Sequence, residues 1–250
     1  MPLVRRTKIV ATIGPATESP EMLEQLIRAG VDVFRVNFSH GTAKAHKQRA
    51  KDIRNVSEKV GRFVGILADL QGPKIRIEQF KDGYVKLVEG QSFTLDADLA
   101  AEDGDINSVG LTYKALPSDV NVGDVLLLDD GLIVLKVEDV TRSKIFCIVE
   151  VGGKLSNNKG VNRLGGGLSA GALTEKDKKD IKLAAEIEAD FLAVSFVRNA
   201  EDVHEARRLL NEAGSDAWIV SKIERAEAID VIEEITLASD VLMVARGDLG

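Results

Sequence analysis

Two charged residues, Lys222 and Glu224, close the short apolar run 220–224, and their types and spacing suit catalysis. Alternate side chains of a strand point to the same face, so both charges share one face of the predicted strand. Unlike charges at the end of a buried strand must be paired with each other or bound to a ligand. Asp248 follows the next apolar run, and we expect Glu224 and Asp248 to hold one divalent metal, with Lys222 beside it over a reacting oxygen. An ordinary Lys–Glu ion pair with a solvated aspartate is the alternative.

Further polar residues stand at the ends of other predicted strands. In one of them Arg35, Asn37 and Ser39 alternate with apolar side chains, and Asp69 follows another. Ligands bind at the carboxyl ends of the strands of a parallel barrel, so we expect these side chains to meet there. Two carboxylates without a histidine pair at metal-binding spacing favour Mg²⁺. A metal, an arginine and a lysine suit phosphoryl transfer, and the same set serves enolate chemistry.

The composition limits the classes to which this protein can belong. The 250 residues carry a net charge of −7, which disfavours nonspecific nucleic-acid binding, and no apolar run approaches the ~20 residues of a membrane span. The single cysteine, Cys147, lies in an apolar run and is predicted to be a buried filler in a reducing compartment. Of the three histidines, His46 and His204 are expected at the surface or on a helix flank, whereas His40 follows the polar residues. We therefore expect a soluble cytoplasmic protein that binds neither nucleic acid nor membranes.

The hydrophobic pattern predicts strands that alternate with helices at both ends of the chain. Such a rhythm is typical of a parallel sheet with crossover helices. The predicted strands are residues 8–13, 31–39, 63–68, 190–196, 217–223 and 240–245. The predicted helices between them are residues 19–30, 42–59, 174–188, 199–213 and 226–237.

The middle of the chain has a different hydrophobic pattern. Residues 74–172 show little helical periodicity and several short strand-like runs, with Asp130-Gly131 as a hairpin turn between two of them. Gly72 and the glycines at 165–167 flank this segment, and glycine suits a hinge. The fold class is therefore α/β, a partial (β/α)₈ barrel of about six strands with an inserted all-β lid domain. The domains are predicted at 1–72 (barrel, first part), 73–171 (lid) and 172–250 (barrel, second part).

Six stretches of the sequence carry a family resemblance. They are residues 5–16, 35–41, 69–76, 158–162, 221–224 and 244–250. In these motifs and in their order the chain resembles the N-terminal half of a pyruvate kinase. The resemblance implies transfer of the phosphoryl group of phosphoenolpyruvate to ADP, giving pyruvate and ATP, with Mg²⁺ as cofactor. It also implies a homotetramer for the full-length protein.

The resemblance assigns roles to individual residues. Lys222 is similar to the lysine that neutralises the transferring phosphoryl group and the enolate. The implied Mg²⁺ ligands are Glu224 and Asp248, and the implied substrate contacts are Arg35, Lys222, Gly247 and Asp248. The implied nucleotide contacts are Asn37, His40, Arg76 and Lys159. The implied monovalent-cation position is made by Asn37, Ser39, Asp69 and the carbonyl of Leu70.

The sequence departs from the family pattern in two ways. Many members carry glutamate where this chain has Lys74, and threonine where it has Leu70. An ammonium group there would stand close to the monovalent-cation position, so we expect no requirement for added K⁺. The last barrel strands and the C-terminal domain of the family are absent from these 250 residues, so we expect little or no activity from them alone.

Two other interpretations stay open at this point. One is another magnesium-dependent barrel enzyme, an aldolase or lyase that forms an enolate from a pyruvate-like acid. A lyase needs no nucleotide clamp, so the β-rich segment and Lys159 argue against it. The other is a noncatalytic module that associates through its open sheet edges.

Overall fold

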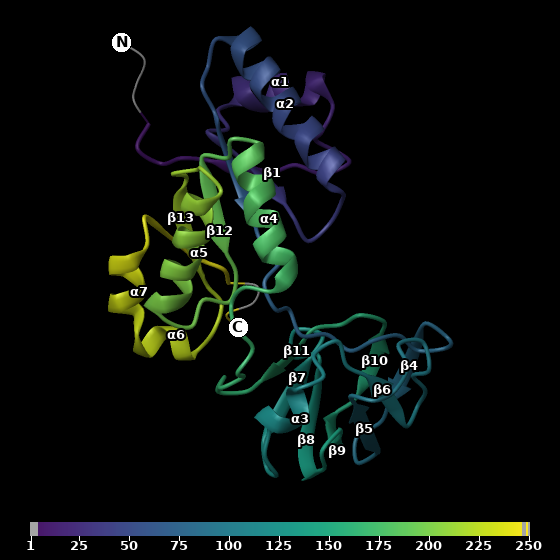
Figure 1. Cartoon of the computed structure of the whole chain (residues 1–250). Coiled ribbons are helices and arrows are strands. Elements are labelled where there is room, and N and C mark those ends of the chain that lie inside the picture. Colours follow the sequence, from purple (N-terminus) through teal and green to yellow (C-terminus); the bar gives the residue numbers. More distant parts are fainter. Residues whose placement is uncertain (1–4, 247–248, 250) are drawn as a thin grey trace. The chain divides into compact units, whose positions relative to one another are not determined.

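The computed structural model describes residues 5–246 and residue 249 of the chain (Figure 1). The described residues divide into two compact units. The first consists of residues 5–73, 171–224 and 228–245, and the second of residues 74–170 and 225–227 with the described residues after 245. In the part of the chain that the structure describes, no helix is long and apolar enough to span a membrane.

The first unit is built on a six-stranded parallel sheet. Its strands, in spatial order, are β1 (Val10–Thr12), β2 (Val33–Asn37), β3 (Gly65–Asp69), β12 (Phe191–Val194), β13 (Trp218–Ile223) and β14 (Val241–Val244). The spatial order follows the chain without a reversal. Right-handed crossovers then carry every helix to the same face, as in a (β/α)₈ barrel, whereas a doubly wound sheet reverses its order. The predicted part-barrel of about six strands is confirmed.

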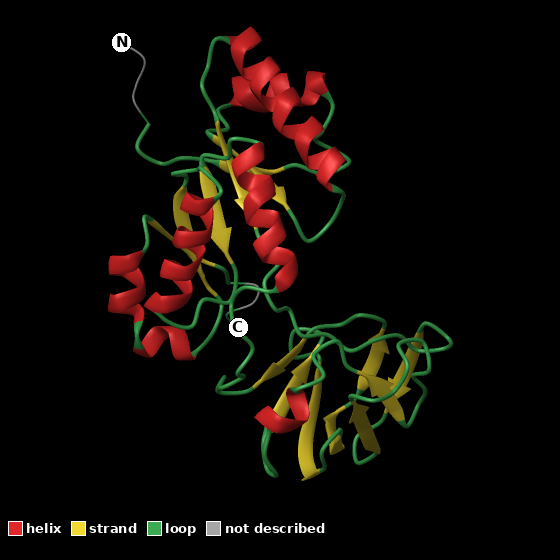
Figure 2. Ribbon diagram, viewed as in Figure 1, coloured by secondary structure: helices red, strands yellow, loops and turns green. Residues whose placement is uncertain are grey.

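Helices cover one face of this sheet (Figure 2). They are α1 (Pro20–Ala29), α2 (Ala43–Val60), α4 (Glu175–Glu186), α5 (Ala200–Glu212), α6 (Glu227–Asp230) and α7 (Ile232–Ala238). Ser19, Thr42 and Asn199 each accept a hydrogen bond from the backbone N–H three residues further on, as N-cap residues do. At the start of the helix predicted over 174–188, Thr174 forms a capping box with Asp177.

The prediction of one helix over 226–237 is wrong. Two short helices, α6 and α7, take its place, and Val231 between them leaves the helical conformation at φ −119° and ψ 23°. Ile229, Val231 and Ile232 are β-branched, and such side chains lose rotamer freedom in a helix. The local preference for helix is weakest at that point, so the break falls there.

The second unit is β-rich. One sheet has the order β11 (Val161–Arg163), β7 (Val125–Leu128), β8 (Ile133–Val140), β9 (Lys144–Val151), β5 (Ser92–Asp96), β6 (Ser108–Gly110), and a separate pair joins β10 (Gly153–Ser156) to β4 (Tyr84–Leu87). The predicted hairpin between β7 and β8 is confirmed, with positive φ at Asp129, Asp130 and Gly131. The sequence pattern did not indicate the strands β10 and β11 or the short helix α3 (Leu116–Asp119).

The second unit encloses its own apolar core. Phe93, Leu95, Leu126 and Leu135 are fully buried in it. Cys147 belongs to the same core, and burial raises the pKa of its thiol to about 12. The prediction of a buried filler is confirmed, because a thiol that stays protonated is a poor nucleophile.

His46 corrects the expectation of surface histidines. It lies on α2 and is only 3% exposed, and its ring packs on Phe38 with 4.5 Å between the centroids. Desolvation lowers the pKa of His46, and the positive charges of Arg49 and Lys176 lower it further, against the opposite effect of Asp180. His46 stands among charged residues in the sequence of α2. The sequence therefore did not show that it lies on the buried side of that helix, against Phe38 in the turn after β2.

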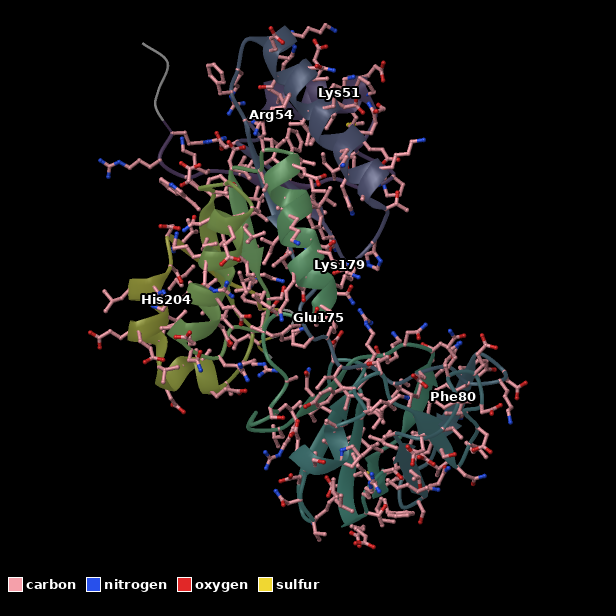
Figure 3. All side chains as sticks on the ribbon, viewed as in Figure 1. Lys51, Arg54, Phe80, Glu175, Lys179 and His204 are labelled. Carbon is pink, nitrogen blue, oxygen red and sulfur yellow. The ribbon has the colours of Figure 1, made fainter. Side chains whose placement is uncertain are left out.

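We expect His46 to make stability depend on pH. The pKa of His46 is lower in the folded than in the unfolded chain. Near and below about pH 6.5 the unfolded chain therefore binds more protons at this residue than the folded chain does. The free energy of unfolding should therefore fall as the pH is lowered from about 7.5 to about 5.5. Denaturant titrations across that range should show a smaller fall for His46→Gln. The exposed His204 on α5 gives the control His204→Gln (Figure 3). An unchanged pH slope in His46→Gln would contradict this.

Candidate active site

The inner face of the six-stranded sheet changes character along its strands. Toward their starts it carries a small apolar cluster of Leu67, Ala193 and Val220, with Val33, Phe191 and Met243 packed against it. Toward their carboxyl ends the same face carries polar side chains. Alternation along each strand places Arg35 and Asn37 after Val33, Asp69 after Leu67, and Lys222 after Val220. The pattern that keeps the apolar side chains together also brings the polar ones to one edge.

Lys222 is the centre of this edge. Its ammonium nitrogen lies 2.8 Å from Oε1 of Glu224 and 3.4 Å from Oδ1 of Asp69, and it donates a 2.8 Å hydrogen bond to Oγ of Ser195. The Lys222 side chain is 11% exposed and both carboxylates only 1%. These are buried ion pairs, in which the loss of one partner leaves a charge without compensation.

The Glu224 carboxylate has one oxygen engaged and one open. Oε2 accepts a 2.8 Å hydrogen bond from the backbone N–H of Phe196. Oε1 has the Lys222 ammonium close by, yet it accepts no hydrogen bond of acceptable geometry, and the same is true of Asp69 Oδ1. Two buried carboxylate oxygens whose close partner is one ammonium group fit the demand of a hard cation for oxygen ligands.

Arg35 closes a row of alternating charges. Its Nε and Nη2 both lie 2.6 Å from Oδ2 of Asp69, and Nη1 donates to Oγ1 of Thr12. The row therefore runs Arg35, Asp69, Lys222, Glu224, with a partly exposed guanidinium at one end and an open carboxylate oxygen at the other. Such a row can take an anion at its first end and a cation at its last.

The predicted monovalent-cation residues come from neighbouring strand ends. Asn37 and Asp69 are paired in the register of β2 with β3, and Oδ1 of Asn37 accepts a hydrogen bond from the N–H of Ser39. The carbonyl of Leu70 accepts a 2.8 Å hydrogen bond from Oγ of Ser195. His40 is exposed in the turn that follows. The structure thus brings this set to one edge, although several of its oxygens already accept hydrogen bonds.

Three predicted site residues belong to the second unit, namely Lys74, Arg76 and Lys159. An antiparallel bridge pairs Arg76 with Gly160, so the segments of Arg76 and Lys159 lie side by side. Arg76 donates a 2.7 Å hydrogen bond to the carbonyl of Asn158, and the Lys159 ammonium lies 2.7 Å from Oδ1 of Asp129.

The second predicted metal ligand is outside the described part of the chain. Gly247 and Asp248 both lie there. Within the described residues, no group of three or more histidine, cysteine or acidic side chains is arranged to hold a metal.

Sequence reasoning missed Ser195 and Phe196. They directly follow β12, at the same edge as the other polar strand ends, and Ser195 is 1% exposed. The rule that found the charged residues at the ends of β2, β3 and β13 would have found Ser195 as well. It was overlooked because it is the one polar residue in the apolar run 191–197, whereas Ser39 alternates with Arg35 and Asn37 in a file of polar residues.

The whole chain is similar to known proteins. The family model described as "Pyruvate kinase, barrel domain" matches residues 4–250. A protein named pyruvate kinase II, from Salmonella typhimurium, is 58% identical over 250 residues, which are 99% of this chain and 52% of that protein. A pyruvate kinase from Haemophilus influenzae is 56% identical over 250 residues, again 99% of this chain and 52% of that protein.

A more distant relative agrees with these two. A pyruvate kinase from Corynebacterium efficiens is 45% identical over 246 residues, which are 98% of this chain and 52% of the relative. The chain spans about half the length of these curated relatives.

Proposed function

Because this chain belongs to the pyruvate kinase family, we propose that the full-length protein transfers the phosphoryl group of phosphoenolpyruvate to ADP. By full-length protein we mean this chain with any residues that follow it in its reading frame. An oxygen of the ADP β-phosphate attacks phosphorus, and the bond from phosphorus to the enol oxygen breaks. The enolate released takes up a proton at its methylene carbon, and the products are ATP and pyruvate.

The row of alternating charges is the observation that carries this proposal. Charge on the bridging oxygen grows during the transfer, and Lys222 supplies a compact positive charge that is already fixed by Ser195, Asp69 and Glu224. Fixed charge costs no reorganisation at the moment of reaction. Arg35 faces the other end, where its planar guanidinium suits the phosphate of phosphoenolpyruvate.

The buried oxygen Oε1 of Glu224, which accepts no well-aligned hydrogen bond, suits the proposed Mg²⁺. When bound, Mg²⁺ would neutralise phosphate and enolate oxygens as a Lewis acid. Asp248 is its proposed second ligand, and Gly247 and Asp248 are proposed contacts of phosphoenolpyruvate. Without the metal, Glu224 keeps its place through Lys222 and the Phe196 amide.

The second unit is proposed as a lid that contributes nucleotide contacts. Arg76 and Lys159 are its proposed nucleotide contacts, and they lie on adjacent segments of it. Asn37 and His40 are the proposed nucleotide contacts of the first unit. The proposed domains remain 1–72, 73–171 and 172–250. We further propose a cytoplasmic homotetramer that binds neither nucleic acid nor membranes.

The proposal predicts a large effect of Lys222 on turnover. In the full-length protein, Lys222→Met should lower kcat for ATP formation by several powers of ten, because charge stabilisation is the largest contribution to such a reaction. A coupled assay of pyruvate release measures it. Lys179→Met, which removes an exposed lysine of α4, is the matched control and should keep full activity (Figure 3).

Two outcomes would contradict the proposal. One is full activity in Lys222→Met, and the other is the absence of ADP binding by calorimetry, which would favour a lyase. Residues 1–250 alone should turn over little or no substrate. Turnover by them that Lys222→Met abolishes would overturn this last expectation and leave the assigned chemistry intact.

Lys74 predicts how the protein responds to K⁺. Its ammonium group is proposed to serve the position made by Asn37, Ser39, Asp69 and Leu70, so turnover should not require added K⁺. Assays of the full-length protein with K⁺ replaced by a large organic cation measure the requirement. Lys74→Glu should create a strong dependence on K⁺. A large activation of the unaltered protein by K⁺ would end the idea.

A further inference from the structure

The turn after β12 has an unusual backbone. Phe196 adopts a positive φ of 56°, a left-handed conformation that is unfavourable for a bulky side chain. Such strain persists only where the surroundings hold it in place, and it is common at functional sites. Here it aims the N–H of Phe196 at Oε2 of Glu224 over 2.8 Å. The Ser195 side chain points from the same turn toward Lys222 and Leu70.

The Ser195 hydroxyl is oriented by its two partners. A hydroxyl has one hydrogen, and Ser195 donates it to the carbonyl of Leu70 over 2.8 Å. A lone pair of the same oxygen is then left for the Lys222 ammonium, also at 2.8 Å. The Leu70 carbonyl therefore fixes the direction in which Ser195 accepts from Lys222.

Ser195 differs from the other partners of Lys222 in its charge. Asp69 and Glu224 are anions, and each offers an oxygen that a cation can claim. The Ser195 hydroxyl is neutral. Its hydrogen bond therefore holds the ammonium without neutralising the positive charge. Ser195 is thus suited to hold Lys222 in place when Oε1 of Glu224 is engaged elsewhere.

The turn is fixed from a second side by Gly72. A Cβ built on Gly72 would come within 2.8 Å of Cβ of Ser195 and 2.9 Å of Cδ2 of Phe196, so only glycine fits there. The N–H of Gly72 donates to Oδ1 of the fully buried Asp177, which also closes the capping box of α4. The segment after β3 therefore packs tightly on the turn, and Ser195 has little freedom to move.

We propose that Ser195 is a positioning residue for phosphoryl transfer, because it holds the Lys222 ammonium over the reacting oxygen, with the Phe196 amide holding Glu224 beside it. This inference rests on the proposed function. Ser195 touches neither phosphorus nor the enol oxygen and acts through Lys222 alone. Its orientation by the Leu70 carbonyl also links Lys222 to the proposed monovalent-cation position.

A double-mutant cycle tests whether Ser195 acts through Lys222. In the full-length protein, Ser195→Ala should lower kcat about 100-fold, since a misplaced catalytic group costs that order of rate, with a much smaller change in KM. In a Lys222→Met background the same substitution should have no further effect on kcat. Equal effects in both backgrounds would overturn the proposal, because a merely structural role is additive.

A second readout needs no activity. A hydrogen-bonded, buried ammonium exchanges its protons slowly, so Lys222 should give a ¹⁵N-ammonium NMR signal that Lys222→Met removes. Ser195→Ala should also remove it. Ser57→Ala is the matched control, because Ser57 is a buried serine whose hydroxyl donates to a carbonyl, that of Arg62, away from the site. It should keep the signal.

The outcomes separate this inference from the proposed function. Persistence of the signal in Ser195→Ala, or its absence from the unaltered protein, would overturn the positioning role. If Ser195→Ala loses the signal but the unaltered protein shows no turnover, the proposed function is refuted and the contact between Ser195 and Lys222 still stands. If Ser195→Ala does not fold, Ser195→Cys replaces it with the same expectations, since a thiol has a similar shape and is only a weak hydrogen-bonding group.

Discussion

The first unit depends on one buried ammonium that lies between two buried carboxylates. Lys222 stands between Asp69 and Glu224 and balances their negative charges, and Arg35 extends the row beyond Asp69. Burial of such charges costs several kcal/mol for each ion, and the attraction between them offsets this cost only where the geometry is good. The row therefore stabilises the fold little by itself. What it provides is a fixed alternation of charge. Its partly exposed guanidinium end can take an anion, and its carboxylate end can take a cation.

The architecture explains how this row can exist at a strand edge. Six parallel strands in chain order place the carboxyl ends of β2, β3, β12 and β13 side by side, and the apolar cluster of Leu67, Ala193 and Val220 sets which way each strand faces. The contact from Lys222 to Asp69 spans β12, which lies between their strands. The turn after β12 fills that gap with the Ser195 hydroxyl and the Phe196 amide. A strained backbone at Phe196 is the cost of meeting both neighbours.

Period-two alternation and cap residues foretold much of the fold. Alternation in β2 placed Arg35 and Asn37 on one face of the strand and Phe34 and Val36 on the other. Thr174 marked the start of α4. Local patterns could not show that Lys222 reaches Asp69, because that contact depends on the neighbouring strand and not on spacing in the chain. They also failed for His46, whose burial against Phe38 is decided by how α2 packs. The break at Val231 does have a local signal, its β-branched neighbours, which the helical periodicity outweighed in the prediction. The assigned roles of the site residues remain predictions.

The free energy of unfolding of Lys222→Met, measured by denaturant titration without metal or substrate, tests the central role of the ammonium most directly. If Lys222 compensates two buried carboxylates, its loss should destabilise the first unit by about 3–5 kcal/mol. The double variant Lys222→Met with Glu224→Gln should recover part of that loss, because one uncompensated charge disappears with it. A loss below about 1 kcal/mol, the size expected of an exposed ion pair, would contradict the account. A double variant whose loss equals the sum of the two single losses would contradict it equally.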